Sequence, residues 1–68
     1  RANAVAPGFV DTEWQKNKPK EIRQNIERKV ALGRFCDPDE LAEVYKMLIE
    51  NSYFNGEIVV VDGGYSYK

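Results

Sequence analysis

The sequence contains no histidine and a single cysteine, Cys36. Without histidine, neither a serine–histidine–aspartate nor a cysteine–histidine arrangement can be built from this chain. One cysteine cannot form an internal disulfide, and no cysteines and histidines have the spacing of a structural zinc site. We interpret Cys36 as a small space-filling side chain rather than a nucleophile, because Arg34 is its only basic neighbour in the sequence. No metal site is expected.

The chain also lacks a long apolar run and an excess of one charge. No apolar run approaches the roughly 18 residues of a membrane span. Ten basic and eleven acidic residues give a net charge of −1. This composition argues against a membrane surface and against nucleic acid as the main partner. A lone thiol without a disulfide framework is typical of a reducing compartment, so we expect a cytoplasmic protein.

The chain is short, and it lacks the disulfides and the structural zinc site that often stabilise short domains. A chain of 68 residues buries only about 60% of the surface that it exposes when unfolded. Domains of this size usually rely on disulfides, metals or association for their stability. We therefore expect that the chain either oligomerises or belongs to a larger protein.

Two short apolar runs predict strands near the two ends of the chain. Residues 2–6, ANAVA, are small and mostly apolar, and Pro7 is expected to end this strand because it lacks a backbone donor. Gly8 permits either a positive φ or the close approach of another group. Residues 58–61 are four consecutive β-branched side chains, which predict a strand covered on both faces. Turns are expected at Asn55-Gly56 and Asp62-Gly63-Gly64, and the tail YSYK is expected to lie on a surface.

A helical pattern follows the first predicted loop. Ile22, Ile26 and Val30 recur at i, i+4 and i+8, which predicts a helix with one narrow apolar stripe. Pro19 fits the first turn of this helix, and Gly33 can end it as a left-handed cap. The remaining face of this helix is charged, and we expect it to face water.

A second helix has a better-defined start. Asp37 is a good N-cap, Pro38 fits the first helical position, and Glu40 completes a capping box. Behind this cap, apolar residues recur at i, i+3, i+4, i+7 and i+8. Earlier in the chain, Asp11 or Thr12 can cap a short helical turn. The predicted apolar face of the second helix comprises Leu41, Val44, Tyr45, Leu48 and Ile49.

The order strand, helices, strand predicts two parallel strands joined by a right-handed crossover. Two strands alone do not make a stable sheet that is covered on both faces. The chain also begins inside a predicted strand and has no initiator methionine. Together these features predict a C-terminal fragment of a larger α/β domain.

Three motifs occur in a distinctive order: NAVAPGFVDT, then LGRFCDPDELAE, then NGEIVVVDGG. In this order they resemble the C-terminal part of short-chain dehydrogenase/reductases. The branch most similar contains 3-oxoacyl-acyl-carrier-protein reductase and the glucose and ribitol dehydrogenase-like enzymes. The resemblance covers essentially the whole chain. It implies an α/β fold in which this strand–helices–strand portion supplies the last two strands of a doubly wound parallel, Rossmann-type sheet. Ligands of such sheets lie outside the carboxyl ends of the strands.

The resemblance implies an NAD or NADP cofactor and a role for the first loop. Pro7 and Gly8 match the loop that lies against the nicotinamide ring, although on the residues alone they indicate only a tight turn. Val10 matches a position whose backbone N–H and C=O pair with the carboxamide. Thr12 matches a hydroxyl that bonds the carboxamide or diphosphate region. The implied cofactor-binding residues are Pro7, Gly8, Phe9, Val10 and Thr12.

The resemblance also divides the domain into a strand and nicotinamide loop (1–12), a substrate lid (13–32), and a capped helix, last strand and tail (33–68). Trp14 is either ordinary lid packing or a wall of the substrate site. The implied substrate is a small carbonyl or alcohol, or an acyl-carrier-linked one, although interspersed glutamates argue against an acidic carrier docking on the lid. Arg34 is expected to form an ion pair or a helix-end bond.

The family's catalytic tyrosine and lysine, one helical turn apart, have no counterpart here. Tyr65 and Lys68 lie in the tail, and Tyr45 and Lys46 are adjacent, so they do not face each other on a helix. The glycine-rich diphosphate turn is also absent. We therefore assign no catalytic residue, and the chain alone is predicted to be inactive.

Three hypotheses follow from this resemblance and its gaps. The leading one is a part of an NAD(P)-dependent oxidoreductase that transfers a hydride between nicotinamide and a carbonyl or alcohol carbon, within a homotetramer or dimer. The second is a non-catalytic truncated relative that acts as an oligomerisation or interaction module through its capped helix and last strand. The third is an unrelated small α/β domain.

Overall fold

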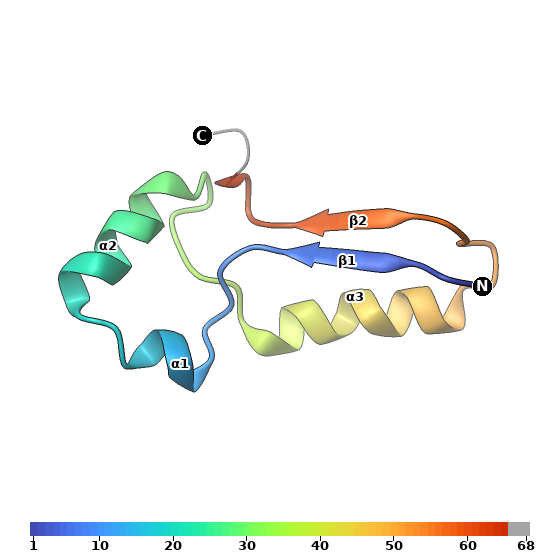
Figure 1. The fold of residues 1–68 in the computed structure, drawn as a ribbon, viewed down its shortest axis with the longest axis horizontal. Coiled ribbons are helices and arrows are strands. Elements are labelled where there is room, and N and C mark those ends of the chain that lie inside the picture. The colour runs from blue at the N-terminus through green and yellow to red at the C-terminus, as the bar shows by residue number, and fades with distance from the viewer. Residues whose placement is uncertain (66–68) are drawn as a thin grey trace.

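The computed structural model describes residues 1–65 and shows two strands and three helices (Figure 1). The expected surface position of the tail concerns mainly residues 66–68, which lie outside the described residues. No helix within residues 1–65 is long and apolar enough to cross a membrane. The elements in chain order are β1 (Ala4–Pro7), α1 (Glu13–Lys16), α2 (Lys20–Lys29), α3 (Pro38–Glu50) and β2 (Ile58–Val61).

The two strands are parallel, as the sequence predicts, and their register runs from Ala4 opposite Ile58 to Pro7 opposite Val61. The strand ends at Pro7, as predicted, and Pro7 is its last paired residue. In a parallel pair, alternate residues of a strand direct their N–H groups at the partner strand. The N–H of Ala4 donates to Glu57, which precedes β2, and the N–H of Gly8 donates to Val61 of β2, so the nitrogen of Pro7 faces away and no ladder bond is lost.

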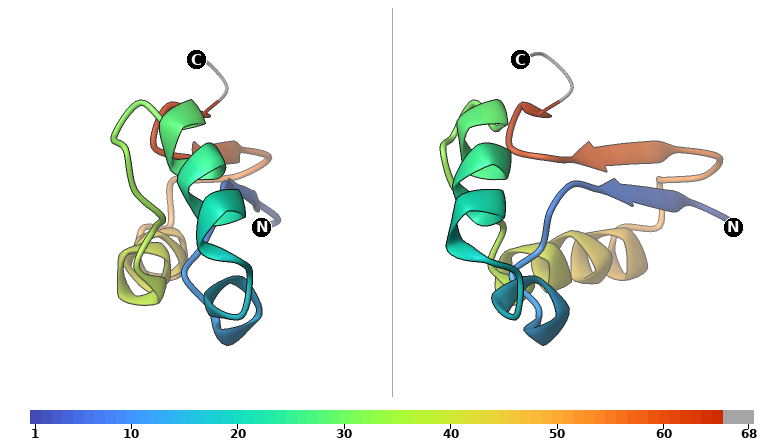
Figure 2. Two further views of the ribbon diagram at one scale, coloured as in Figure 1. Left: turned by 90° about the vertical axis from the view of Figure 1, so that its left-hand side faces the viewer. Right: turned by 60° about the vertical axis from the view of Figure 1, so that its left-hand side comes forward.

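One face of the sheet is covered and the other is bare within this chain. The helix α3 runs alongside β1 in the direction opposite to the strands (Figures 1 and 2). Val5 and Val59 are half-buried, whereas Ile58 is 65% exposed and Val60 57% exposed. The helices of this chain therefore cover one face of β2 only, which agrees with the prediction that the chain is a portion of a larger α/β sheet.

The start of α3 forms as predicted. The side chain of Asp37 accepts the N–H of Asp39 at 2.9 Å, and the carboxylate of Glu40 accepts the N–H of Asp37 at 3.0 Å, so the capping box is complete. Of the predicted apolar face, Leu48 is buried, but Ile49 is 75% exposed. The remaining members are Leu41 and Val44, which are half-buried, and Tyr45, which is exposed.

The carboxyl end of α3 is held by a residue that the sequence did not single out. The guanidinium of Arg1 donates to the carbonyl oxygens of Leu48, Ile49 and Asn51, at 3.2 to 3.3 Å, and to Phe54 at 2.8 Å. A cation at this end also interacts favourably with the helix dipole. Arg1 therefore joins the beginning of the chain to the end of α3.

The helix α2 ends earlier than predicted. It stops at Lys29, and Val30 is already extended, because the following segment bonds to the end of β2 instead of continuing the helix. The N–H of Leu32 donates to the carbonyl of Gly63 at 3.1 Å, and Val30 is 3% exposed. Gly33 does adopt a positive φ of 74°, but in the turn beyond the helix rather than as its cap. Pro19 precedes the helix as its N-cap instead of occupying its first turn.

The remaining turn predictions are confirmed. Gly56 has a positive φ and donates its N–H to the carbonyl of Ala2 at 2.7 Å. Gly63 and Gly64 also have positive φ, and the N–H of Gly64 bonds the carboxylate of Asp62 at 2.9 Å. Among the described residues, the buried apolar side chains are Val30, Phe35 and Leu48.

Candidate functional site

The candidate site is the first loop, residues 8–12, which leaves β1 at the edge of the sheet where both strands end. Because the strands are parallel, their carboxyl ends meet at this edge, and α1 and α2 lie beyond it (Figure 1). Gly8 opens the loop and donates its N–H to the carbonyl of Val61 at 2.9 Å. A side-chain carbon on Gly8 would lie 2.8 Å from the Cα of Asp62, and Gly8 does not adopt a positive φ. Close approach, and not a positive φ, therefore requires glycine here.

The loop is held by a short backbone ladder to a distant segment. Val10 forms a parallel bridge with Cys36, in which the N–H of Cys36 donates to Phe9 at 2.9 Å and the N–H of Asp11 donates to Cys36 at 2.8 Å. A parallel bridge of this kind uses the groups that flank Val10 and leaves its own N–H and C=O on the opposite side. The carbonyl of Val10 accepts the N–H of Thr12 at 2.8 Å, and its N–H has no partner among the described residues.

Thr12 occupies the N-cap of α1, but its hydroxyl does not cap the helix. Its carbonyl accepts the N–H of Lys16 at 3.0 Å, and its side chain makes no cap hydrogen bond. Of the two residues expected to cap this turn, Asp11 and Thr12, it is Thr12 that occupies the N-cap position. It binds the helix through its backbone carbonyl and not through its side chain. Thr12 is an exposed residue.

Phe9 anchors the loop through its side chain. Its ring lies 6.0 Å from the ring of Phe35 and 5.4 Å from the ring of Tyr65, the latter edge to face. The ammonium of Lys18 lies 5.8 Å from the centre of the Phe9 ring. The ring of Phe9 is thus engaged in packing against Phe35 and Tyr65, which holds the loop to the segment 30–36 and to the end of the described chain.

Trp14 lies in the first turn of α1 and is 77% exposed. Its indole ring is therefore largely uncovered by the described residues. Both interpretations of Trp14, lid packing and a wall of the substrate site, stay predictions.

Sequence reasoning missed the connection between α2 and the first loop. Arg23, which was placed on the solvated face of its helix, donates to the carboxylate of Asp11 at 3.1 Å. Its guanidinium carbon also lies 4.3 Å from the centre of the Phe35 ring. No sequence signal pairs Arg23 with Asp11 or Phe35, because the three residues lie in different segments and no periodicity relates them.

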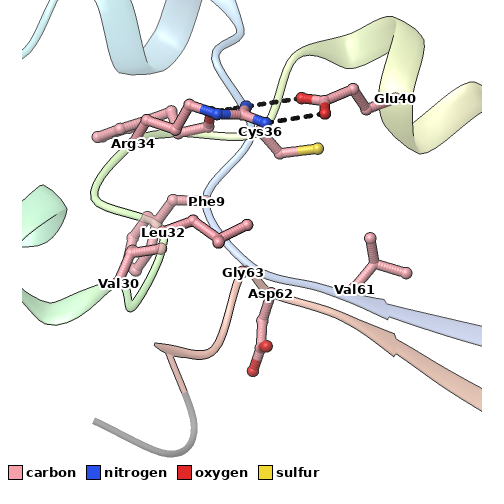
Figure 3. Close-up of a pocket in the computed structure, with 10 residues that line it drawn as sticks. Phe9, Val30, Leu32, Arg34, Cys36, Glu40, Val61, Asp62 and Gly63 are labelled. Atoms are coloured by element: carbon pink, nitrogen blue, oxygen red, sulfur yellow. Dashed lines mark hydrogen bonds and ion pairs between the residues drawn. The ribbon is translucent and has the colours of Figure 1, made fainter.

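A small pocket of about 100 Å³ lies behind the loop, between the segment 30–36 and the end of β2 (Figure 3). Arg34 binds the carboxylate of Glu40 at its rim through two hydrogen bonds, of 2.7 and 2.9 Å, which confirms the expected ion pair. The side-chain bonds from Arg34 and the Asp37 N–H hold the pKa of Glu40 at about 2. The pocket is lined by Phe9, Val30, Leu32, Arg34, Phe35, Cys36, Glu40, Val61, Asp62 and Gly63.

Cys36 lies in the wall of this pocket and donates weakly to the carbonyl of Asp37 at 3.3 Å. Burial raises the pKa of its thiol, followed by the negative charge of Glu40. A raised pKa leaves less thiolate at neutral pH, which fits a space-filling cysteine better than a nucleophile.

Comparison with known proteins places this chain in a family. A family model described as enoyl-(acyl carrier protein) reductase matches residues 1–66. The 3-oxoacyl-[acyl-carrier-protein] reductase FabG of Thermotoga maritima is 41% identical over 66 residues, which are 94% of this chain and 27% of that protein. The chain thus spans about a quarter of the length of such curated relatives.

Solved structures share the same arrangement of strands and helices. The TT0495 protein of Thermus thermophilus is 33% identical, with a TM-score of 0.84, and the match covers all of this chain and 30% of that one. A small-chain dehydrogenase solved in complex with NADPH is 29% identical, with a TM-score of 0.85, over all of this chain and 33% of that one. The fold is therefore the strand–helices–strand portion of a Rossmann-type α/β sheet, as predicted. The chain belongs to the short-chain dehydrogenase/reductase family, near its 3-oxoacyl-acyl-carrier-protein reductase branch.

Proposed function

We propose that this chain forms the nicotinamide side and the substrate lid of an NAD(P)-dependent oxidoreductase. The observation that carries the proposal is the hydrogen-bonding capacity that the backbone of Val10 keeps. Its N–H has no partner among the described residues, and its C=O keeps one lone pair, on the side of the loop opposite the Cys36 bridge. An amide presents a complementary donor and acceptor, so a carboxamide fits this backbone position.

The neighbouring residues fit the same cofactor. Pro7 is exposed at the carboxyl end of β1, which is the edge where parallel sheets bind their ligands. Gly8 presents no side chain, and the hydroxyl of Thr12 is uncommitted. We assign Pro7 and Gly8 to the ring, Val10 to the carboxamide, and Thr12 to the carboxamide or the diphosphate, with Phe9 holding the loop in place. When bound, the cofactor supplies or accepts the hydride.

The substrate side is the lid, residues 13–32, which contains α1 and α2. We propose that exposed Trp14 contributes a wall to the substrate site and that closure of the lid excludes water from it. Among relatives, 3-oxoacyl-[acyl-carrier-protein] reductase and acetoacetyl-CoA reductase are named for carbonyl substrates on thioester carriers. A small carbonyl or alcohol, free or on a carrier, is therefore the proposed substrate class.

The chain does not hold the family's paired tyrosine and lysine, so its contribution is binding and positioning. The proton donor and the diphosphate turn must come from the remainder of the domain, in the cytoplasmic dimer or tetramer that we propose. On its own, the 68-residue chain is proposed to be inactive.

The test uses the intact oxidoreductase that carries this chain and measures NADH and NADPH binding by isothermal titration calorimetry. Replacing Thr12 by Val removes one hydroxyl and should weaken cofactor binding about fivefold, the equivalent of ~1 kcal/mol. The matched control is Thr12→Ser, which keeps the hydroxyl and should bind as the parent does. Equal affinity in all three proteins would show that Thr12 serves only the start of α1.

A second candidate function is an oligomerisation or interaction module. It is favoured by the exposed apolar side chains of Tyr45 and Ile49 on α3, and of Ile58 and Val60 on β2. An intact protein that binds neither NADH nor NADPH but self-associates through these side chains would favour this candidate over the oxidoreductase.

A further inference from the structure

Arg23 projects from α2 onto both chain segments that form the backbone ladder of the first loop. Its Nη1 donates to Oδ1 of Asp11 at 3.1 Å, and its guanidinium carbon lies 4.3 Å from the centre of the Phe35 ring. Asp11 directly follows Val10, and Phe35 directly precedes Cys36. Arg23 therefore contacts the two neighbours of the Val10–Cys36 bridge, one on each segment.

The surroundings of Arg23 favour a lasting contact. Its side chain is only 23% exposed and that of Asp11 only 34% exposed, so both charges are partly removed from water. Partial desolvation strengthens both the ion pair and the attraction between a cation and an aromatic face. Phe35 is buried and packs against Phe9, so the platform under the guanidinium is itself fixed.

No other charged side chain of α2 has such a connection within the described residues. Arg28 bonds only Asn25, which lies on the same helix. The apolar stripe of α2 holds the helix weakly, since Ile22 is 47% exposed and Ile26 is half-buried. The polar attachment of α2 to the first loop therefore rests on Arg23.

We propose that Arg23 is a positioning residue that couples the lid to the nicotinamide loop. It fixes α2 against Asp11 and Phe35, so the lid and the Val10 backbone groups hold one arrangement relative to each other. This proposal rests on the proposed function for its kinetic consequence, but not for its structural one. Arg23 acts through Asp11 and Phe35 and touches neither reactant.

The structural test is hydrogen–deuterium exchange, followed by mass spectrometry, on the intact protein that carries this chain. In Arg23→Gln, amide exchange should rise about five- to tenfold in α2 and in the first loop, since an ion pair and a cation–aromatic contact are both lost. The matched control is Arg28→Gln, which removes an arginine from the same helix without a tertiary contact and should leave both segments unchanged.

A double-mutant cycle separates the coupling from general destabilisation. Asp11→Asn should produce part of the same increase in exchange, and adding it to Arg23→Gln should produce little more. Arg23→Lys keeps the charge and should restore part of the protection. If Arg23→Gln fails to fold, Asp11→Asn alone decides the question, with Arg28→Gln as its control. Equal exchange in α2 for the Arg23 (or Asp11) and Arg28 variants would overturn the proposal.

The kinetic readout tests the consequence for the oxidoreductase. With the lid less well placed, KM for the carbonyl substrate should rise about five- to tenfold in Arg23→Gln, while kcat falls less than about twofold. A purely structural role would lower the amount of active enzyme and leave KM unchanged, and that result would overturn the coupling. If the parent shows no oxidoreductase activity, the proposed function fails, and the exchange measurements still decide the role of Arg23.

Discussion

Gly8 lies at the point where the chain leaves β1, and the packing of the protein itself requires that this residue have no side chain. A Cβ at this position would meet the Cα of Asp62 at 2.8 Å and the Cβ of Asp62 at 2.9 Å. Backbone atoms in a strand end cannot swing aside as a flexible side chain can. A large residue at Gly8 would therefore separate β1 from β2, so weaker cofactor binding in Gly8→Val would not identify a cofactor contact.

We predict that Gly8→Ala lowers the free energy of unfolding of the intact protein by about 1–3 kcal/mol, because it overpacks the contact with Asp62. Urea denaturation followed by circular dichroism measures this loss. The matched control is Gly33→Asn, since Gly33 has open space around it and asparagine tolerates its positive φ. A Gly8→Ala protein as stable as the parent would show that the strand ends adjust freely.

The individual residues differ in how far the sequence predicts them. For Gly8 the sequence predicts either close approach or a positive φ, and the structure selects the first. The pairing of Arg34 is predictable because its partner lies in the adjacent cap. The contacts of Arg1 and Arg23 are not, because their partners lie far along the chain and no periodicity relates them.

The capping box at the start of α3 depends on the negative charge of Glu40, and this charge depends on pH. The bonds from Arg34 and from the N–H of Asp37 lower the pKa of Glu40 from its ordinary 4.5 to about 2. A carboxyl with a lowered folded pKa stabilises the fold fully above its unfolded value, and this contribution is lost as the pH falls through the folded value. The capping box should therefore weaken between pH 4.5 and 2 and stay constant above that range.

The prediction is checked by following the carboxyl carbon of Glu40 by NMR during an acid titration of the intact protein. Its midpoint should lie near pH 2. In Arg34→Met the midpoint should move toward 4.5, because the hydrogen bond from Arg34, which is the largest cause of the lowered pKa, is removed. A midpoint near 4.5 in the parent protein would mean that the pair does not persist in solution.

The helices and strands show where local signals suffice. The cap of α3 is encoded within four consecutive residues, 37–40, so the sequence predicts it correctly. The end of α2 depends on the bond between Leu32 and Gly63, which lies in a different element, and therefore the sequence does not predict it. The β-branched run 58–61 correctly predicts a strand, but its second cover is not supplied by this chain.

The molecule as a whole is less compact than a typical folded chain with the same number of residues. The radius of gyration is 13.6 Å, whereas a compact chain of this length has about 11 Å. Its extents are 42 × 25 × 15 Å, and among the described residues only Val30, Phe35 and Leu48 are buried apolar side chains. So little buried surface does not offset the conformational entropy lost when a chain becomes ordered.

We therefore predict that the isolated 68-residue chain has no cooperative thermal transition. Circular dichroism between low and high temperature measures this, and the matched control is the intact protein under the same conditions. The signal of the isolated chain should change gradually. A sigmoidal melt of the isolated chain, independent of its concentration, would contradict this prediction and establish it as a self-sufficient unit.

The ladder between Val10 and Cys36 has a further consequence for where the chain tolerates a change of length. Because the bridge joins the two ends of the intervening segment beside the loop, that segment leaves the loop and returns to the same place. Doubling the length of a flexible closed loop costs only about 0.6 kcal/mol. A change of length in the connection between α1 and α2, residues 17–19, should therefore leave the loop in place, whereas residues 30–35 are fixed by the bond of Leu32 to Gly63 and by the buried Val30 and Phe35.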